Sequence, residues 1–412
     1  MRDSKGNQAI LEQRLPLLTC ELRTVAPLGL KTTAKRARVL FVIDQLCAFG
    51  GAEKVLFEII DCLSVEKHHC RVITFKCNTE LSFLRQLPCP IHVLPLDRTY
   101  DLHALKVAIE IRRLIKHWGI DVVHTFHETS DLWAGMIAKV SGCPVLISSR
   151  RDMGFQRSTK HEVGYRIMGR YFDKVLCVSE RVRQRCLQTE GLSPSRVLTL
   201  YNGINLSQVD SVAGGKAFRS TLGIPADAPL ITTVGNMRWI KGTDLLIHAA
   251  EQVCRLCPNA IFLVVGEVLE SGYFQHLNKL VASLGLDRNV IFAGARDDVY
   301  SILKCSNVFC LPSRSEGFSN ALIEAMACAL PAVATDVGGN SEAILDGKTG
   351  FLVQPENPER LANRLVHLID FPAKARSLGQ AGRRIVEQRF TCEAMMTKLI
   401  GVYDELLTAK SE

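Results

Sequence analysis

The chain of 412 residues lacks any apolar run approaching the roughly 18 residues needed to span a bilayer. Its first 36 residues also lack the unbroken apolar stretch of a secretory signal peptide. We therefore expect no membrane-spanning helix, and we interpret residues 1–36 as a flexible leader. The hydrophobic content of 47% and the charged content of 22% are ordinary for a globular protein, and the length suits two domains.

Several binding signatures are missing as well. No Gly-x-Gly-x-x-Gly fingerprint occurs, which disfavours a dinucleotide-dependent dehydrogenase. The triplet Gly347-Lys348-Thr349 does not complete a triphosphate-binding loop, because Glu342 stands where that loop has its first glycine. No recognition signature of a nucleic-acid-binding protein is present, so we expect no nucleic-acid partner.

The fifteen cysteines do not form the framework of a small disulfide-rich domain, because they are scattered through predicted strands and helices. This distribution is typical of free thiols in a reducing compartment. The one close pair, Cys254-x-x-Cys257, ends a predicted helix just before a strand. We interpret this pair as packing rather than as a metal or redox site.

Short apolar runs recur along the chain, and a helical pattern follows each of them. This alternation predicts parallel sheets covered on both faces, and its two sets predict two doubly wound α/β domains. We place the domains at 37–207 and 224–388, with a linker at 208–223 and a C-terminal helix at 389–412. Ligands of such sheets bind beyond the carboxyl ends of the strands. The predicted strands are Val39–Ile43, Val72–Phe75, Ile91–Leu94, Val122–Thr125, Val145–Ile147, Val175–Val178, Val197–Leu200, Leu230–Val234, Ile261–Val265, Val290–Phe292, Val308–Leu311, Ala332–Thr335 and Phe351–Val353.

Positive charge is concentrated in the N-terminal half of the chain. Residues 1–205 hold 30 Lys/Arg and 20 Asp/Glu, whereas residues 206–412 hold 20 and 22. An anionic partner, either a membrane surface or a lipid-phosphate acceptor, would suit this half.

One basic segment of this half has two interpretations that stay open. It is a solvated loop and helix, or an interfacial patch that docks on anionic lipid. Its basic residues are Arg150, Arg151, Arg157, Lys160, Arg166 and Arg170, and the interleaved apolar residues are Phe155, Tyr165, Ile167, Met168, Tyr171 and Phe172.

The most informative stretch runs from Ser315 to Ala327 and holds two glutamates eight positions apart. Glu316 sits in a turn rich in glycine and serine, and Glu324 lies about one turn into a predicted helix with Asn320 as N-cap. Backbone N–H groups at a helix start bind phosphate or sugar oxygens. Carboxylates on either side accept hydrogen bonds from hydroxyls. A ligand with a diphosphate, a ribose and a hexose fits this inventory.

Three further segments follow predicted strands. Gly50-Gly51 opens a helix, and its interpretations are a tight turn or close approach of the backbone to a ligand. In Gly235–Gly242, Arg238 and Lys241 can neutralise a diphosphate, and cations near a helix start otherwise carry a small cost. His124, His127 and Glu128 end a strand of the first domain, where a histidine faces either the ligand or the core.

These motifs together resemble the retaining glycosyltransferases of family 4, the group 1 glycosyl transferases, which share the GT-B fold. The Glu316-x7-Glu324 pair carries the resemblance, and it extends over roughly residues 38–390. The resemblance implies two Rossmann-like domains facing across a cleft, with the C-terminal helix crossing back to the N-terminal domain. That first domain would bind the acceptor and the second the nucleotide sugar. The sequence departs at Asn236, where the family often has an arginine.

By this resemblance Glu316, Lys241, Arg238 and His127 would act in catalysis. Glu324 would hold the ribose, while Arg296 lies in a loop near the base. His124 and Glu128 would contact the acceptor or sugar, with His127 the favoured histidine. No metal is expected, because no Asp-x-Asp motif stands in a suitable place. The other donor-binding residues would be Gly50, Gly51, Gly317, Phe318, Ser319 and Asn320.

The implied activity is transfer of a hexose from a UDP- or GDP-sugar to a lipid-linked or saccharide acceptor. We expect a role in bacterial cell-surface polysaccharide or glycolipid synthesis. The expected location is cytoplasmic, with peripheral contact at the anionic inner face of the plasma membrane. Two alternatives stay open. One is a non-catalytic partner that binds a sugar nucleotide or scaffolds another enzyme, and the other is a sugar-nucleotide epimerase of GT-B fold.

Overall fold

The structure is a computed structural model and describes residues 36–48, 50–66, 68–78, 84, 87–155 and 157–411. The predicted leader therefore lies outside the described residues, apart from Arg36. Within the described part, no helix is long and apolar enough to cross a membrane.

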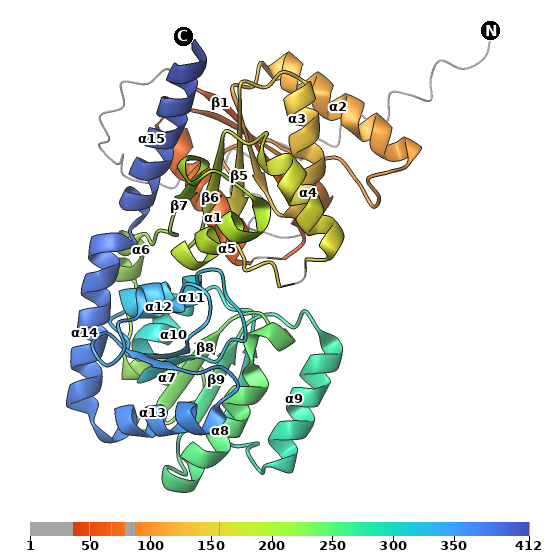
Figure 1. Ribbon diagram of the computed structural model, residues 1–412. Helices are drawn as coiled ribbons and strands as arrows, with labels where there is room; N and C mark the ends of the chain where they lie inside the picture. Colours follow the sequence, from red (N-terminus) through yellow and green to blue (C-terminus); the bar gives the residue numbers. More distant parts are fainter. Residues whose placement is uncertain are drawn as a thin grey trace. The chain divides into compact units, whose positions relative to one another are not determined.

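The first sheet has seven strands in the order β3-β2-β1-β4-β5-β6-β7. Strand β1 pairs in parallel with β2 and with β4, and β4 pairs in parallel with β5. Figure 1 shows α2, α3 and α4 on one side of this sheet and α1 on the other. The strands are β1 Arg38–Leu46, β2 His69–Cys77, β3 Ile91–Val93, β4 Val122–Phe126, β5 Val145–Arg150, β6 Lys174–Cys177 and β7 Val197–Thr199.

Helices alternate with these strands. They are α1 Gly51–Val65, α2 Leu102–Trp118, α3 Gly135–Val140, α4 Thr159–Gly169 and α5 Glu180–Glu190, with a π-helical turn, η2, at Ser130–Ala134.

The second sheet has six strands in the order β10-β9-β8-β11-β12-β13, and neighbouring strands pair in parallel. One hydrophobic cluster packs α8, α9 and α13 on this sheet, and a second packs α7 and α10 on it. The strands are β8 Leu230–Val234, β9 Ile261–Val265, β10 Val290–Gly294, β11 Val308–Leu311, β12 Ala332–Thr335 and β13 Phe351–Val353.

The helices around and after this sheet are α6 Leu206–Ser211, α7 Lys216–Thr221, α8 Thr243–Leu256, α9 Ser271–Ser283, α10 Val299–Cys305, α11 Asn320–Ala327, α12 Asn340–Ala343, α13 Pro358–Asp370, α14 Pro372–Arg389 and α15 Cys392–Ser411. The short 3-10 turns η3 and η4 lie at Pro194–Arg196 and Trp239–Lys241.

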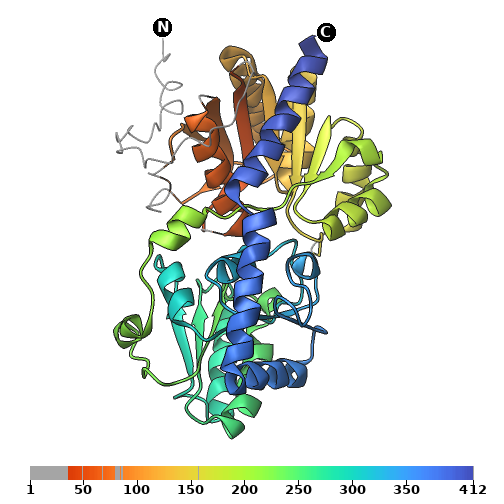
Figure 2. The ribbon, with the colours of Figure 1, turned by 90° about the vertical axis from the view of Figure 1, so that its left-hand side faces the viewer.

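The chain divides into two compact units. Of the described residues, unit 1 comprises those from Arg36 to Ser149, Thr159–Val175 and those from Ile400 onward, and unit 2 comprises those of Arg150–Ser158 and Leu176–Leu399. The end of α15 is fastened within unit 1, where the buried Tyr403 hydroxyl bonds His124 Nδ1 at 2.8 Å. The predicted linker, residues 208–223, holds the end of α6 and all of α7. Figure 2 shows the end of α15, which belongs to unit 1, running in front of the strands of the first sheet.

The strands of both sheets form where the apolar runs predict them. The central strands are buried on both faces, as in β4, β5 and β9, so that no polar alternation is visible in their sequences. The predicted N-cap of the Glu324 helix is wrong by one residue. Ser319, not Asn320, caps α11, because its hydroxyl accepts a hydrogen bond from the N–H of Leu322.

The cysteines of the described residues are free. Burial raises the pKa of the Cys254 thiol to about 11, and it also raises that of Cys257. A redox or metal-binding thiol needs the opposite shift, so the pair favours the packing interpretation.

Candidate functional site

The carboxyl ends of β8 and β11, which pair in parallel, bring two predicted catalytic residues together. Lys241 Nζ lies 2.8 Å from Glu316 Oε1, and the Ser313 hydroxyl donates to the same oxygen at 2.6 Å. Glu316 is 8% exposed, so the pair is partly desolvated. A cation next to a hydrogen-bonding carboxylate can serve both a phosphate and a sugar hydroxyl.

Helix α11 starts four residues after Glu316. Phe318, Ser319 and Glu324 are all buried, and Glu324 is only 5% exposed. The amides at this helix start, which the Ser319 cap fixes in direction, can bind an anion. The second glutamate of the pair thus lies inside unit 2 rather than on a solvated helix face.

A second turn packs against the Glu316 turn. The N–H of Gly339 donates to the carbonyl of Gly317 at 3.0 Å, and a side chain at Gly338 would overlap the carbonyl of Glu316. Gly338 also has a φ of 50°, which disfavours other residues. The two turns therefore fix the backbone of Glu316.

Two arginines of the predicted site, the catalytic candidate Arg238 and the donor-binding candidate Arg296, contact other carboxylates. Arg238 Nε lies 3.3 Å from Glu270 Oε1, and the same carboxylate accepts the N–H of Trp239. Arg296 forms an ion pair with Asp298 two positions on. The structure thus brings Lys241 to Glu316 but pairs Arg238 and Arg296 with local carboxylates.

Sequence reasoning missed Arg314, which braces this region. Its guanidinium bonds both carboxylate oxygens of Asp244 at 2.8 and 2.7 Å, donates to the Trp239 carbonyl, and stacks 4.4 Å from the Trp239 ring. Burial alone would raise the pKa of Asp244, but hydrogen bonds from Arg314 and Tyr273 lower it. The brace holds the Trp239–Lys241 turn. The only feature of the sequence that could have indicated a role for Arg314 is its position two residues before Glu316.

The prediction that His124 contacts acceptor or sugar needs correction. His124 is fully buried in unit 1, and its two ring nitrogens bond Tyr403 and Ser149, each at 2.8 Å. With both nitrogens satisfied and no exposed surface, His124 packs the core.

His127 stands at the end of β4 in a left-handed conformation with a φ of 74°. Such backbone strain persists only where the surroundings impose it, and it gathers at functional sites. The backbone just after His127 is held by Asp44, which accepts the N–H groups of Thr129 and Ser130 at 2.9 and 2.7 Å. Glu128 lies 3.5 Å from His161.

The other predicted residues of unit 1 form the start of α1. Gly50 is its N-cap and Gly51 its first residue. A side chain at Gly50 would meet Glu53 Oε2 at 2.6 Å, and Glu53 is itself buried.

Two family models match the chain in tandem. The model described as "Glycosyl transferases group 1" matches residues 216–385, and the model described as "Glycosyltransferase Family 4" matches residues 49–208. The chain belongs to the group 1 glycosyl transferases. Within the described residues of this glycosyltransferase, no cluster of three His, Cys, Asp or Glu side chains is arranged to hold a metal.

Curated relatives agree with this family. One is "UDP-Gal:alpha-D-GlcNAc-diphosphoundecaprenol alpha-1,3-galactosyltransferase" of Escherichia coli, 21% identical over 83% of this chain and 90% of the relative. Another is a "D-inositol 3-phosphate glycosyltransferase" of Streptomyces bingchenggensis, 30% identical over 57% of this chain and 53% of the relative.

Solved structures show the same fold. A glycosyltransferase from Rickettsia africae superposes with a TM-score of 0.80 at 22% identity, covering 90% of this chain and 99% of its own. Anabaena HepE, solved in complex with UDP-glucose, superposes with a TM-score of 0.79 at 22% identity, covering 89% of this chain and 99% of its own. The two parallel sheets of this glycosyltransferase therefore form the GT-B fold.

Proposed function

We propose that this glycosyltransferase moves a hexose from a UDP-sugar to the hydroxyl of a lipid-linked acceptor, with retention of the anomeric configuration. The observation that carries the proposal is the contact of Lys241 with Glu316 beside the capped start of α11. A cation, a carboxylate and helix amides are the groups that would bind a sugar diphosphate, so their proximity supports the proposal.

The donor's leaving diphosphate gains negative charge as the bond to the sugar breaks. Lys241 and the amides at the start of α11 stabilise that charge, and this lowers the barrier because the charge is largest in the transition state. Arg238 joins them when the diphosphate competes for it with the half-exposed Glu270. This set supplies the charge stabilisation without a metal ion.

The two glutamates bind the two sugar rings of the donor. Glu316 accepts hydrogen bonds from hexose hydroxyls, and the buried Glu324 accepts those of the ribose. The acceptor hydroxyl attacks from the face that the diphosphate leaves, and a phosphate oxygen takes its proton. His127 and Glu128 remain the proposed contacts of sugar or acceptor in unit 1.

Two similar proteins support the choice of donor and acceptor. The Escherichia coli relative is named for UDP-galactose and a diphosphoundecaprenol-linked sugar, and HepE was solved with UDP and with UDP-glucose. These similarities favour a UDP-hexose and a lipid-diphosphate acceptor in the synthesis of a surface polysaccharide or glycolipid.

Contact with an anionic membrane is part of the proposal, and unit 1 offers a surface for it. On the outward face of α2, Leu102, Leu105 and Ile109 are 80%, 58% and 60% exposed. The spacing of three and four residues places them on one face. Exposed basic residues lie beside them at Lys106, Arg112, Arg113 and Lys116.

In the basic segment between residues 150 and 172, some residues fit an interfacial membrane patch and others do not. Val163, Ile167 and Tyr171 are exposed next to Lys160, Arg166 and Arg170, which fits an interfacial patch. Tyr165, Met168 and Phe172 are buried in the core, and so is Arg150. We restrict the proposed membrane surface to the exposed residues of α2 and α4 and to the adjoining Arg170 and Tyr171.

The test is a panel of UDP- and GDP-hexoses incubated with the protein and a lipid-diphosphate acceptor. We expect release of UDP that depends on both substrates, and a product whose anomeric proton coupling in NMR matches that of the donor. An inverted anomer would overturn retention. Tight UDP binding without any turnover would favour the scaffold alternative, and interconversion of free sugar nucleotides would favour an epimerase. Treatment with EDTA should leave the rate unchanged.

A further inference from the structure

The segment between β5 and α4 lies in the N-terminal half of the sequence, yet Arg150–Ser158 groups with unit 2. The described residues between Arg150 and Thr159 form no helix or strand, so side-chain contacts have to hold this segment. The structure provides an anchor at each end, Arg150 and Arg157, and both bind a single carboxylate, that of Glu190 at the end of α5.

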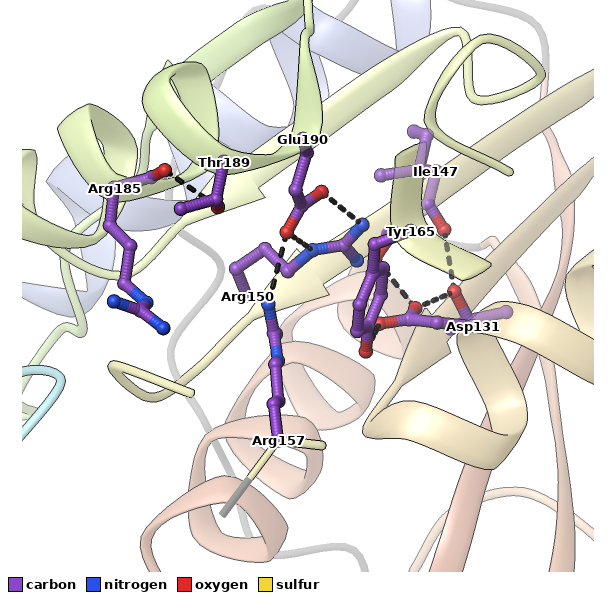
Figure 3. A network of polar contacts seen from close by, with 10 residues as sticks. Asp131, Ile147, Arg150, Arg157, Tyr165, Arg185, Thr189 and Glu190 are labelled. Atoms are coloured by element: carbon purple, nitrogen blue, oxygen red, sulfur yellow. Dashed lines mark hydrogen bonds and ion pairs between the residues drawn. The ribbon is translucent and has the colours of Figure 1, made fainter. Parts of the chain in front are cut away.

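The three side chains form a buried ion cluster. Arg150 reaches Glu190 through Nε at 3.3 Å and Nη2 at 3.0 Å, and Arg157 Nη1 lies 3.0 Å from Oε1. Their side chains are 0%, 8% and 2% exposed for Arg150, Arg157 and Glu190. Figure 3 shows the two guanidinium groups converging on the carboxylate. Burial would raise the pKa of Glu190, but the guanidinium groups hold it below the ordinary value.

Such a cluster is a costly way to stabilise a fold. Removing charges from water costs about as much as their attraction returns, so apolar residues of equal volume would often serve as well. The cluster instead fixes the position of the segment, because charged hydrogen bonds hold both of its ends in one arrangement.

Between its anchored ends, the segment touches three parts of the candidate donor site. The carbonyl of Arg151 lies so close to Gly317 that a side chain at Gly317 would overlap it. The Arg151 guanidinium bonds Asn202 at 2.6 Å, and Asn202 bonds Asn320, the first residue of α11. The ring of Phe155 lies 6.1 Å from that of Trp239, in the turn that carries Lys241.

We infer that Glu190 is a positioning residue of the donor site. By holding Arg150 and Arg157, Glu190 fixes Arg151 and Phe155 against Gly317, Asn320 and Trp239. These contacts keep the Glu316 turn, the start of α11 and the Lys241 turn at the spacing that a sugar diphosphate requires. This inference rests on the proposed function, although the mechanical link can be measured without it.

The first experiment measures that link by amide hydrogen exchange in the intact protein. Glu190→Gln keeps the size of the side chain but loses its charge. We expect exchange to accelerate at least tenfold both in residues 151–158 and in residues 315–322, with residues 299–311 unchanged. Unchanged exchange at 315–322 would overturn the inference whether or not the protein is a glycosyltransferase.

The second experiment separates positioning from general stability. Arg219→Met is the matched control, because Arg219 is also a buried arginine of unit 2, bonded to the carbonyls of Cys305, Ala226 and Ala228. We expect Glu190→Gln to raise the donor KM at least tenfold, and Arg219→Met to change it less than twofold at equal loss of thermal stability. An equal rise in both variants would overturn the inference.

A third variant covers the case in which Glu190→Gln does not fold. Arg157→Met removes one anchor and leaves the pair of Arg150 and Glu190 intact. It should raise exchange at 315–322 and the donor KM in the same direction, by at least threefold. A folded Arg157→Met with wild-type exchange and KM would contradict the inference. If the wild-type protein neither binds nor turns over any sugar nucleotide, the proposed function fails, and the exchange result still decides the link.

Discussion

At the scale of single residues, the donor site depends on a few paired charges that are buried or partly buried. Lys241 contacts Glu316, and Arg314 contacts Asp244 beneath the same turn. Each charge lies near the carboxyl ends of β8 and β11, where little water screens it. Substitutions here should therefore change turnover and binding more than folding.

Lys241→Ala should lower kcat by about 100- to 1,000-fold, while donor affinity changes less. The reason is that the charge on the leaving diphosphate grows toward the transition state. Steady-state kinetics with a UDP-hexose measures both quantities. A variant with wild-type kcat and only a raised KM would show that Lys241 binds the ground state alone.

Glu324→Gln should weaken UDP binding by about 1.5–3 kcal/mol, because hydrogen bonds from ribose hydroxyls to a charged acceptor are lost. Isothermal titration with UDP measures this, and titration with inorganic diphosphate is the control, since that ligand has no ribose. An equal loss for both ligands would remove Glu324 from the ribose site.

His127→Gly should abolish most of the activity and leave the free energy of unfolding within about 1 kcal/mol of the wild type. Glycine relieves the left-handed strain at this position, which offsets its extra chain entropy in the unfolded state. Urea unfolding beside an activity assay checks both halves. Full activity in a stable variant would make the histidine a residue of the turn only.

The sequence predicts where the candidate site residues lie better than it predicts which residues they contact. The motif predicts Glu316 in a turn and Glu324 about one turn into the following helix, and in the structure Glu316 lies between β11 and α11 and Glu324 within α11. It does not reveal that Glu270 engages Arg238 or that Tyr403, 279 positions away, engages His124. Such pairs depend on long-range packing, which one sequence does not encode in a readable pattern.

At the scale of elements, the strands are the most predictable part of the fold. All thirteen apolar runs coincide with β1 to β13, because buried parallel strands need continuous apolar sequence. The N-cap of α11, Ser319, is harder to predict from the sequence. Serine and asparagine stand side by side there, and both are good N-caps.

The position of α11 depends on α14, which packs against it. Gly379 of α14 lies so close to the carbonyl of Ala329, just past α11, that a side chain would overlap it. Gly379→Ala should lower the free energy of unfolding by about 1–3 kcal/mol. Gly272→Ala in α9 is the control, because no atom lies within 4 Å of the added carbon. Equal stability of the two variants in urea would contradict this packing.

At the scale of the whole molecule, the proposed membrane surface can be tested by vesicle flotation. Recovery should rise with anionic lipid and fall with salt, since each basic residue near the surface contributes about 1 kcal/mol and is screened. The substitution of Lys160, Arg166 and Arg170 by serine should reduce recovery. Substituting the exposed Lys374, Arg376 and Arg384 of unit 2 in the same way is the charge-matched control. Equal recovery with neutral and anionic vesicles would contradict the proposal.

The central claim is that the Lys241 end of unit 2 binds the donor diphosphate. Calorimetric titration with UDP and UMP tests it most directly, because the two ligands differ by the second phosphate. The account predicts that the wild type prefers UDP and that Lys241→Ala loses most of this preference. Lys348→Ala, at the exposed lysine of the Gly347-Lys348-Thr349 triplet, should retain it. A preference for UDP that survives Lys241→Ala, or that disappears in Lys348→Ala, would contradict the account.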